Sequence, residues 1–406
     1  MTSHTIERLG YLGEGIADGP IYAPLTLPGE VVSGDLDGER LTNVRIETPS
    51  EDRVKPPCRH FKACGGCLLQ HASDDFVAEW KLEVVRTALR AQEINTNVAH
   101  IVTSPIQSRR RATFSSRRTK KGAMAGFHAR GSDSVIEIPD CILLDPEVLT
   151  GRTIAEELAV IGVSRKGELA VAVTKSAGGL DIQVQGGKPL DGQLRIDLAN
   201  LVGRRDIARL AWGDEVIAEA RQPYQQFGWA KVVPPAGAFL QATSEGEASL
   251  LKSVIDAVSG AKKTADLFAG CGTFSLPLAE LGEVSAYEGQ QDMIEALDKG
   301  WRMASGLKTV TAKTRDLFRR PLLTDELDGF DAVVIDPPRA GAKAQVAELA
   351  LSSVPIIAFV SCNPVTFARD AKTLLSGGYE LESVSVVDQF RWSPHIETVA
   401  KFAKPN

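Results

Sequence analysis

The sequence predicts an α/β protein in three parts: a small β-barrel, an α+β middle domain, and a C-terminal domain whose parallel sheet is covered by helices. Short β-like runs separated by turns fill residues 5–48, and mixed strand and helix patterns fill residues 98–222. After residue 237 strands alternate with helices, which is typical of a doubly wound sheet. We place the three domains at residues 1–52, 53–235 and 236–406.

Local patterns define the barrel and the segment that follows it. Gly and Asp break the runs IYAPLT and VVSGDLDGERLTNVRI, which indicates tight turns between short strands. SEDRVKPPC is typical of a linker because it carries two prolines. Residues 75–92 carry Phe76, Trp80 and Val84 at helical spacing, so we expect an amphipathic helix. This helix could pack on the C-terminal domain.

Composition and charge limit the possible classes of function. With 43% hydrophobic residues the chain can bury sizeable cores, and its net charge of -6 argues against a protein that coats nucleic acid non-specifically. Residues 109–121 nevertheless form the run RRRATFSSRRTKK, which contains seven cations and no acid. An RNA-contacting strand pair and a solvated surface face both remain open for this run.

Targeting signals are lacking in the sequence. The N-terminus has no apolar stretch of a secretion signal, and no segment approaches the ~20 apolar residues that a membrane span needs. We therefore expect a cytoplasmic protein.

A cluster of cysteines points to a metal site. Cys58, Cys64 and Cys67 fall within ten residues, with two glycines that let the chain fold around an ion. Cys141, in IPDCILLD, can supply a fourth ligand. Four thiolates suit tetrahedral zinc or an iron–sulfur cluster, and the spacing leaves both open.

The stretch TADLFAGCGTFSLPLAELG places a glycine-rich turn between a short strand and a helix. Gly270 and Gly272 permit a tight turn and a close approach of the backbone to a ligand. Glu288 ends the next strand, eighteen residues past Gly270, where an acid can accept hydrogen bonds from ribose hydroxyls. Because no G-x-G-x-x-G is present and Asp266 precedes the loop, the pattern favours S-adenosylmethionine over a dinucleotide.

Two further acids belong to the same edge of the sheet. Asp316, in TRDLF, lies where class I methyltransferases place a group near the adenine, and Asp336 ends the strand DAVVID. The alternative for these acids is a solvent-facing strand end.

Three stretches bear on catalysis: VVIDPPRAG, FVSCNPVTFARD and DQFRWSPHIETVAKF. Each adjoins a β-like run, so their polar residues should meet at one edge of the sheet. Taken alone, Cys362 would be a small buried hydrophobe at a strand end, and we interpret His395 and Cys271 as structural.

Methylation of a uracil at C5 would use residues of this kind. A thiolate that adds to C6 makes C5 nucleophilic toward a sulfonium methyl group, and a base must then remove the C5 proton. Cys362 has the placement for the first role, and Glu397 has it for the second.

The motifs DLFAGCGTFSLPLA, DPPRAG, SCNPVTFARD and HIETV occur in this order, and with them the chain resembles the RNA uracil-C5 methyltransferases over nearly its whole length. The resemblance implies a class I S-adenosylmethionine-dependent methyltransferase (Rossmann-like) domain, with Cys362 as the nucleophile and Glu397 as the proton acceptor. It also implies a set of cofactor contacts, to which we add Asp316: Gln241, Phe268, Glu288 and Asp336. Thr273 departs from the pattern, because relatives often carry Asn there.

The segment CRHFKACGGCLLQH, with a distant fourth cysteine, is similar to the ribosomal-RNA branch of that family. The resemblance implies a [4Fe-4S] cluster on Cys58, Cys64, Cys67 and Cys141, and a TRAM domain, a small RNA-binding barrel, at the N-terminus. It favours 23S rRNA as the substrate, with tRNA as the alternative. A fold-organising and RNA-positioning role suits the cluster, because methyl transfer moves no net electrons. We expect a monomer with no obligate protein partner and no membrane contact.

Two other functions compete with this interpretation. An RNA-binding or iron–sulfur maturation protein could keep the methyltransferase-like domain as a scaffold, but the retained pair Cys362 and Glu397 argues against it. Methylation of an exocyclic amine or of a protein needs no thiolate, and DPPR replaces a DPPY-type amine clamp here. The sequence does not identify the uridine, nor the side chain that fills the gap left by a flipped base.

Overall fold

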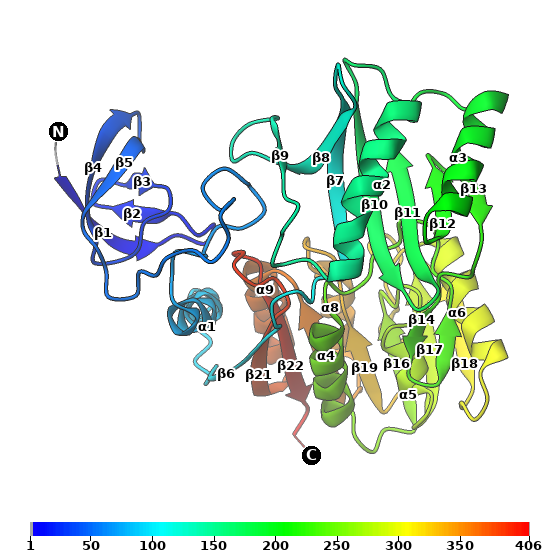
Figure 1. Ribbon diagram of the computed structural model, residues 1–406. Helices are drawn as coiled ribbons and strands as arrows, with labels where there is room; N and C mark the ends of the chain where they lie inside the picture. Colours follow the sequence, from blue (N-terminus) through cyan, green and yellow to red (C-terminus); the bar gives the residue numbers. More distant parts are fainter. Residues whose placement is uncertain (1–2, 406) are drawn as a thin grey trace.

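The computed structural model describes residues 3–405, which form three bodies (Figure 1). Five short strands close into an N-terminal barrel in the order β1-β2-β3-β5-β4. They are β1 (Ser3–Leu9), β2 (Gly15–Ala17), β3 (Ile21–Ala23), β4 (Val31–Asp37) and β5 (Arg40–Thr48). Ile6, Val32 and Leu41 fill the interior, because alternate residues of a strand point to the same side. The expected N-terminal barrel is therefore confirmed.

A seven-stranded sheet forms the middle body, in the order β13-β12-β11-β10-β7-β8-β9. Its strands are β7 (Arg111–Arg118), β8 (Ala123–His128), β9 (Val135–Glu137), β10 (Glu168–Ser176), β11 (Gly179–Gln185), β12 (Ile207–Trp212) and β13 (Glu215–Glu219). Helices α2 (Pro146–Gly162) and α3 (Gly192–Arg204) share one apolar core with this sheet. Only β11 and β12 pair in parallel, so the arrangement is α+β.

An eight-stranded sheet forms the C-terminal body, in the order β18-β17-β16-β19-β20-β22-β21-β6. Its strands are β6 (His100–Thr103), β16 (Lys263–Leu267), β17 (Glu283–Glu288), β18 (Val310–Thr314), β19 (Ala332–Ile335), β20 (Ile356–Ser361), β21 (Glu380–Asp388) and β22 (Glu397–Ala403). The five strands from β16 to β20 pair in parallel, and β22 runs antiparallel to both of its neighbours. The carboxyl ends of the parallel strands therefore meet at one edge.

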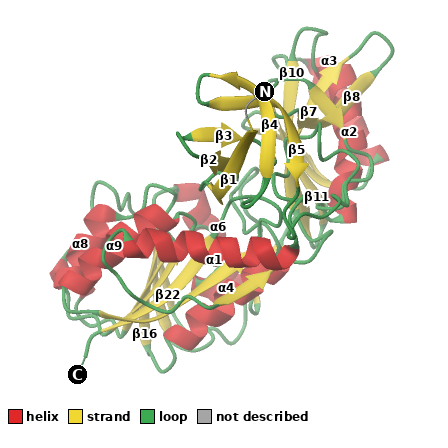
Figure 2. Cartoon of the chain, turned by 90° about the vertical axis from the view of Figure 1, so that its left-hand side faces the viewer, coloured by secondary structure: helices red, strands yellow, loops and turns green. Residues whose placement is uncertain are grey.

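Helices cover both faces of this sheet. One apolar core joins it to α4 (Ser244–Ala257), α5 (Ser275–Leu278), α6 (Gln291–Met303) and the hairpin of β14 (Gln225–Phe227) and β15 (Ala230–Val232). The other core joins it to α1 (Asp74–Arg90), α7 (Thr324–Leu327), α8 (Lys343–Leu351) and α9 (Pro364–Ser376). Figure 2 shows α1, α8 and α9 on one side of the strands. This is the doubly wound layering that the alternating pattern predicts.

The helix α1 and the strand β6 complete the C-terminal body, although they precede the middle sheet in the chain. Leu82, Val85 and Leu89 of α1 lie in the same core as α8 and α9, and β6 pairs with β21. Lys81 is fully buried, and its Nζ donates to Asp388 Oδ1 at 2.5 Å. The segment placed at 53–235 from the sequence thus contributes to two bodies. Among the helices of residues 3–405, none has the length and apolarity that crossing a membrane requires.

Candidate active site

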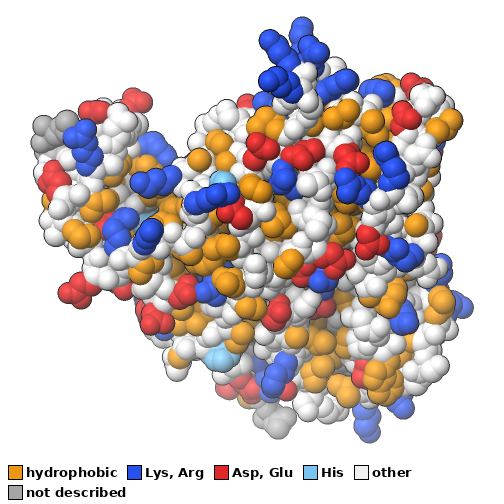
Figure 3. Space-filling model, viewed as in Figure 1, with side chains coloured by type: hydrophobic (Ala, Val, Ile, Leu, Met, Phe, Trp, Pro, Cys, Tyr) orange, Lys and Arg blue, Asp and Glu red, His pale blue; other side chains and the backbone are white. Residues whose placement is uncertain are grey.

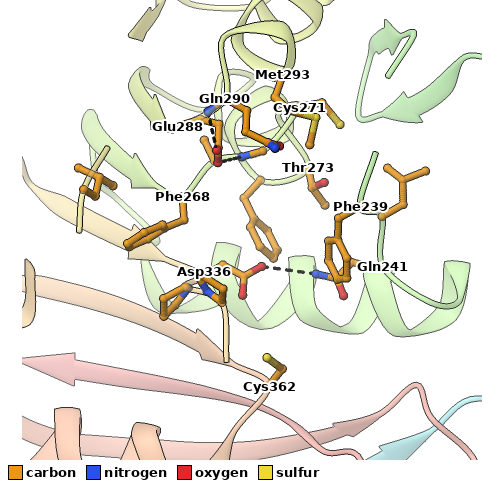
Figure 4. Close-up of a pocket in the computed structure, with 18 of the residues that line it drawn as sticks. Phe239, Gln241, Phe268, Cys271, Thr273, Glu288, Gln290, Met293, Asp336 and Cys362 are labelled. Carbon is orange, nitrogen blue, oxygen red and sulfur yellow. Dashed lines mark hydrogen bonds between the residues drawn. The ribbon is translucent and has the colours of Figure 1, made fainter. Parts of the chain in front are cut away.

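A cavity of about 400 Å³ lies at the carboxyl edge of the C-terminal sheet (Figure 4). The loops that follow β16, β17, β18, β19 and β20 meet there, together with the start of β22. All seven residues predicted from the sequence to bind a cofactor or to react line this cavity: Gln241, Phe268, Glu288, Asp316, Asp336, Cys362 and Glu397. The fold therefore gathers them, and their individual roles stay predictions.

Glu288 and the glycine turn form one wall of the cavity. The Glu288 carboxylate accepts the backbone N–H of Gly270 at 3.1 Å and that of Gln290 at 3.0 Å (Figure 4). Gly272 has φ 100°, and a Cβ there would come within 2.9 Å of Leu276 and Leu297. Only glycine fits this turn, because the backbone is left-handed there and a Cβ would press on apolar side chains.

Phe268 and Asp316 stand on the adjacent wall. Phe268 has φ 63°, which strains a residue other than glycine, and its ring centroid lies 5.4 Å from that of Phe318. Asp316 Oδ1 accepts the backbone N–H groups of Phe318 at 3.0 Å and Arg319 at 3.2 Å. Asp316 therefore fixes its own loop while it lines the cavity.

Asp336 faces Gln241 across the cavity (Figure 4). Gln241 Nε2 donates to Asp336 Oδ2 over a long 3.5 Å. Burial raises the pKa of Asp336 to about 7. Burial also raises the pKa of Asp266 to about 7, and Asp266 Oδ2 accepts the Ser275 hydroxyl at 2.5 Å, which ties β16 to α5.

Cys362 is held at the junction between β20 and α9. Asn363 caps the helix, because its Oδ1 accepts the Val365 N–H at 3.1 Å, and Pro364 occupies the first turn. Burial, and then the carboxylates of Glu397 and Asp336, raise the pKa of the Cys362 thiol to about 12. At neutral pH the thiol therefore keeps its proton until something nearby stabilises the thiolate.

Glu397 begins β22 and is only 3% exposed. Burial first, and then the neighbouring Asp336 carboxylate, raise the pKa of Glu397 well above its ordinary value, while Gln389 and Arg339 act against this shift. A carboxyl with a raised pKa is suited to accept a proton near neutral pH.

Sequence reasoning missed two residues at this site. Arg339, directly after the two prolines of DPPRAG, is the only basic residue among those lining the cavity in the described chain, and it lowers the pKa of Cys362 and of Glu397. The motif DPPRAG marks this stretch of the chain, but its spacing gives no reason to single out the arginine. Gln389 could not be identified from the sequence, because a single glutamine in a polar stretch belongs to no characteristic motif.

The sequence indicates structural roles for His395 and Cys271. The His395 ring lies 5.5 Å from the Phe390 ring, and burial lowers the pKa of His395. Cys271 lines the cavity but packs in an apolar core cluster, and burial raises its pKa to about 12.

The basic run at 109–121 divides into two parts. Arg110 Nε donates to Gln241 O at 2.9 Å, and Arg111 Nη1 donates to Leu240 O at 2.9 Å, so these arginines hold the segment that carries Gln241. The exposed cations of the second part stand on the β7–β8 hairpin, where Lys and Arg gather at the top of Figure 3: Arg118, Lys120 and Lys121.

The other cysteines line a second, smaller cavity together with Phe61 and Phe127: Cys58, Cys64, Cys67 and Cys141. Burial raises the pKa of Cys67 to about 12, and the other three cysteines add to the shift. Arg130 lies beside them and donates from Nη2 to Cys67 O at 2.9 Å. Within residues 3–405 no group of three or more His, Cys, Asp or Glu side chains is arranged to hold a metal ion. The four-thiol donor set itself has the chemistry that iron–sulfur clusters use.

Comparisons with known proteins identify the family of this chain. The family model described as tRNA (Uracil-5-)-methyltransferase matches residues 187–404. A Brucella suis protein named an uncharacterized RNA methyltransferase is 43% identical over 98% of this chain and 97% of its own. The 23S rRNA (uracil(1939)-C(5))-methyltransferase RlmD of Shewanella piezotolerans is 30% identical over 98% of this chain and 95% of its own.

Among solved structures, the Pyrococcus abyssi tRNA (uracil-54, C5)-methyltransferase in complex with S-adenosyl-L-homocysteine shares the fold. Its TM-score is 0.76 at 22% identity, over 99% of both chains. The family model covers more than half of the 406 residues, and the relatives align along nearly the full length. The chain belongs to the tRNA (uracil-5-)-methyltransferase family.

Proposed function

We propose that this protein methylates C5 of a uridine in 23S rRNA, with S-adenosylmethionine as the methyl donor. The observation that carries the proposal is that Cys362 and Glu397 line the same cavity as Glu288 and the glycine turn. A nucleophile, a base and a ribose-binding carboxylate then face one reaction space. The name of the Shewanella piezotolerans relative favours 23S rRNA as the substrate.

Each residue has one task in the reaction. S-adenosylmethionine supplies an electrophilic methyl group when bound, and Glu288 accepts hydrogen bonds from its ribose hydroxyls. Phe268, Asp316, Gln241 and Asp336 complete that binding wall. Burial and the carboxylates of Glu397 and Asp336 raise the pKa of Cys362, and the cation of Arg339 opposes that rise.

The covalent steps use two side chains of this chain. Cys362 gives its proton to water, its sulfur bonds to C6 of uracil, and C5 takes the methyl group as the sulfonium C–S bond of the donor breaks. Glu397 then accepts the C5 proton, the C5–C6 double bond forms again, and the C6–S bond breaks to release the Cys362 thiolate. The target base must leave its stack to enter the cavity.

RNA that contains 5-fluorouridine tests the proposal, because fluorine at C5 leaves no proton for Glu397 to remove. Incubation with the methyl donor should accumulate a covalent protein–RNA adduct that resists denaturation, and Cys362→Ala should abolish it. If neither ribosomal nor transfer RNA gave such an adduct, the proposal would fail.

A tRNA uridine is the second candidate substrate. The name of the matching family and the name of the Pyrococcus abyssi protein favour it. Sequencing the trapped nucleotide from mixed ribosomal and transfer RNA decides between the two, since each substrate predicts an adduct in one RNA class.

We also propose that Cys58, Cys64, Cys67 and Cys141 hold a [4Fe-4S] cluster, and that the N-terminal barrel is a TRAM domain that contacts RNA. The shared cavity of the four thiols and the adjacent Arg130 and Arg109 support a negatively charged cluster. The measurement is the iron and acid-labile sulfide content of protein purified without oxygen. Zinc in place of iron would overturn the cluster assignment.

A further inference from the structure

A further hollow, of about 690 Å³, lies between helix α6 and the β14–β15 hairpin, which pack against each other (Figure 1). Helix α6 links it to the cavity that contains Cys362: Met293, near the start of the helix, lines that cavity, and Met303, at its end, lines the hollow. The ten residues from Met293 to Met303 span ~15 Å of helix, which roughly four or five nucleotides of a stacked strand would cover. An RNA whose target base occupies the cavity is therefore long enough to reach the hollow.

The hollow is positively charged, although the whole chain has a net charge of -6. Its lining includes three exposed cations and no acid: Arg221, Lys231 and Lys299. Arg221 pairs with Asp206, and its Nε donates to Gly178 O at 2.6 Å. Within residues 3–405 no ion pair engages Lys231 or Lys299, so both can neutralise phosphates.

Trp229 adds an open aromatic surface to these cations. It is 60% exposed, although tryptophan is highly buried on average in proteins. Its backbone N–H donates to Glu280 Oε1 at 3.0 Å, and a Cβ on Gly306 would come within 2.9 Å of its ring. The ring therefore rests against the bare backbone of Gly306 while most of it stays open to solvent. A nucleobase can stack on a ring that is held in this way.

Tyr224 and Met303 extend this apolar surface. Lys231 Nζ lies 4.9 Å from the centroid of the Tyr224 ring, so a cation and a ring lie side by side. The Met303 side chain is exposed at the end of α6. Aromatic rings interleaved with cations bind single-stranded nucleic acid with little regard to its sequence, because every base has a face to stack and every nucleotide has a phosphate.

We propose that this hollow is a second RNA-binding site, in which an unpaired base of the substrate RNA stacks on Trp229 and the neighbouring phosphates meet Lys231 and Lys299. The inference rests on the proposal that RNA is the substrate, and it adds a contact outside the cavity where the methyl group is transferred.

Polycytidylate tests the site, because it is single-stranded and offers no uridine to the reaction cavity. It should quench the tryptophan fluorescence of the wild type, since Trp229 is the most exposed tryptophan of residues 3–405. Trp229→Phe should remove the quenching and keep the affinity within about threefold, because phenylalanine still stacks. Trp301→Phe is the control that should keep the quenching, since Trp301 is partly buried and donates to Lys308 O at 3.0 Å.

Affinity measurements with the same polymer test the stacking and the charges separately. Trp229→Ala should weaken binding roughly fivefold to a hundredfold, because the stacking surface is lost. Leu351→Ala is its control, because Leu351 is an exposed apolar residue on α8. Lys231→Gln and Lys299→Gln should each lower the slope of log affinity against log salt by about 0.7, relative to Lys252→Gln on α4.

The site would be refuted if the quenching persisted in Trp229→Phe, or if Trp229→Ala bound polycytidylate as tightly as Leu351→Ala does. Lysine variants with the salt slope of Lys252→Gln would also overturn it. These measurements need neither Cys362 nor the methyl donor, so they are independent of the proposed reaction. A wild type that forms no adduct with 5-fluorouridine RNA would refute that reaction, whereas a wild type without Trp229-dependent binding would refute only the second site.

Discussion

The two cavities that contain cysteines place the same chemical group among different neighbours. Cys362 shares its cavity with carboxylates, and Glu397 and Asp336 add to the effect of burial in raising its pKa. The four clustered cysteines lie near Arg109 and Arg130 instead. Burial raises the pKa of Cys67 and of Cys362 alike to about 12, so the two cavities differ in the groups that surround the thiols and not in the direction of the shift. Four thiols beside arginines suit a shared ligand set, and one thiol beside a carboxylate suits a nucleophile that has a base next to it.

Replacing the nucleophile should give the largest effect and separates the two groups of cysteines. Cys362→Ala should lower methylation by at least roughly 10⁴-fold, because it removes the sulfur that bonds to C6 in the proposed reaction. Cys64→Ser should still form an adduct with 5-fluorouridine RNA. Denaturing gel electrophoresis reports both, and a Cys362→Ala protein that still forms the adduct would exclude the covalent mechanism.

Replacing the base should stop the reaction one step later. Glu397→Gln has the same size but cannot accept the C5 proton, so turnover should fall about 10²- to 10⁴-fold while the methylated adduct accumulates on ordinary uridine RNA. The measurement is the ratio of methyl label trapped in the protein–RNA adduct to methyl label in released RNA. A slow variant without accumulated adduct would place Glu397 in an earlier step.

The pH profile is sensitive to the carboxylates around Cys362. Because its pKa is raised to about 12, the thiol is protonated at neutral pH and must lose that proton to react. We expect kcat/KM to rise with pH, by up to roughly tenfold per unit between about pH 6 and 8. Initial rates in buffers of constant ionic strength test this. If kcat/KM fell with pH over the same range, the expected direction of the pH dependence would be wrong.

The four-cysteine cavity should control stability more than chemistry. Cys64→Ser should lose iron and lower the free energy of unfolding by about 4 kcal/mol, the value for a ligand present at a thousand times its dissociation constant. Thermal unfolding without oxygen measures the shift against the wild type and against Cys271→Ala, which removes a cysteine outside the four-cysteine cavity without burying a hydroxyl. Unchanged stability and RNA affinity would count against a fold-organising cluster.

The smallest effect should come from the exposed hairpin. Replacing Arg118, Lys120 and Lys121 by Gln should reduce the slope of log affinity against log salt by roughly 0.7 to 0.9 per lost phosphate contact. Lys252→Gln is the control, because Lys252 is exposed on α4 and pairs with Asp256. Filter binding at several salt concentrations provides the slope for each protein. If the hairpin variant had the same slope as the wild type, the hairpin would be a solvated face.

Much of the cavity could be predicted because parallel strands deliver their carboxyl ends to one edge. Glu288, Asp336 and Cys362 each follow a strand, so their order in the chain already implied that they meet. Gln389 could not be found in this way, since its place beside Gln241 depends on hydrogen bonds between segments far apart in the chain.

The basic run at 109–121 shows that a local pattern can also be misleading, because part of the run is buried. Seven cations in one stretch indicate one surface, yet Arg110 is 7% exposed and supports the Gln241 segment through bonds that span more than a hundred residues. The position of α1 is equally non-local, because its partner strands and helices lie near the other end of the chain. Local sequence patterns predict the helices and strands. The surroundings of each helix or strand depend on packing between segments that lie far apart in the chain.

The buried pair of Lys81 and Asp388 also constrains how the molecule is synthesised and folded. The two residues lie 307 positions apart, so the lysine leaves the ribosome long before its partner exists. Until then the apolar side of α1 has no sheet to cover, while the barrel and the middle sheet have all their strands. The C-terminal body therefore closes last, around a helix made early. A fragment that begins after residue 235 would lack α1 and β6, and it would expose the surface of α9 and β21 that they cover.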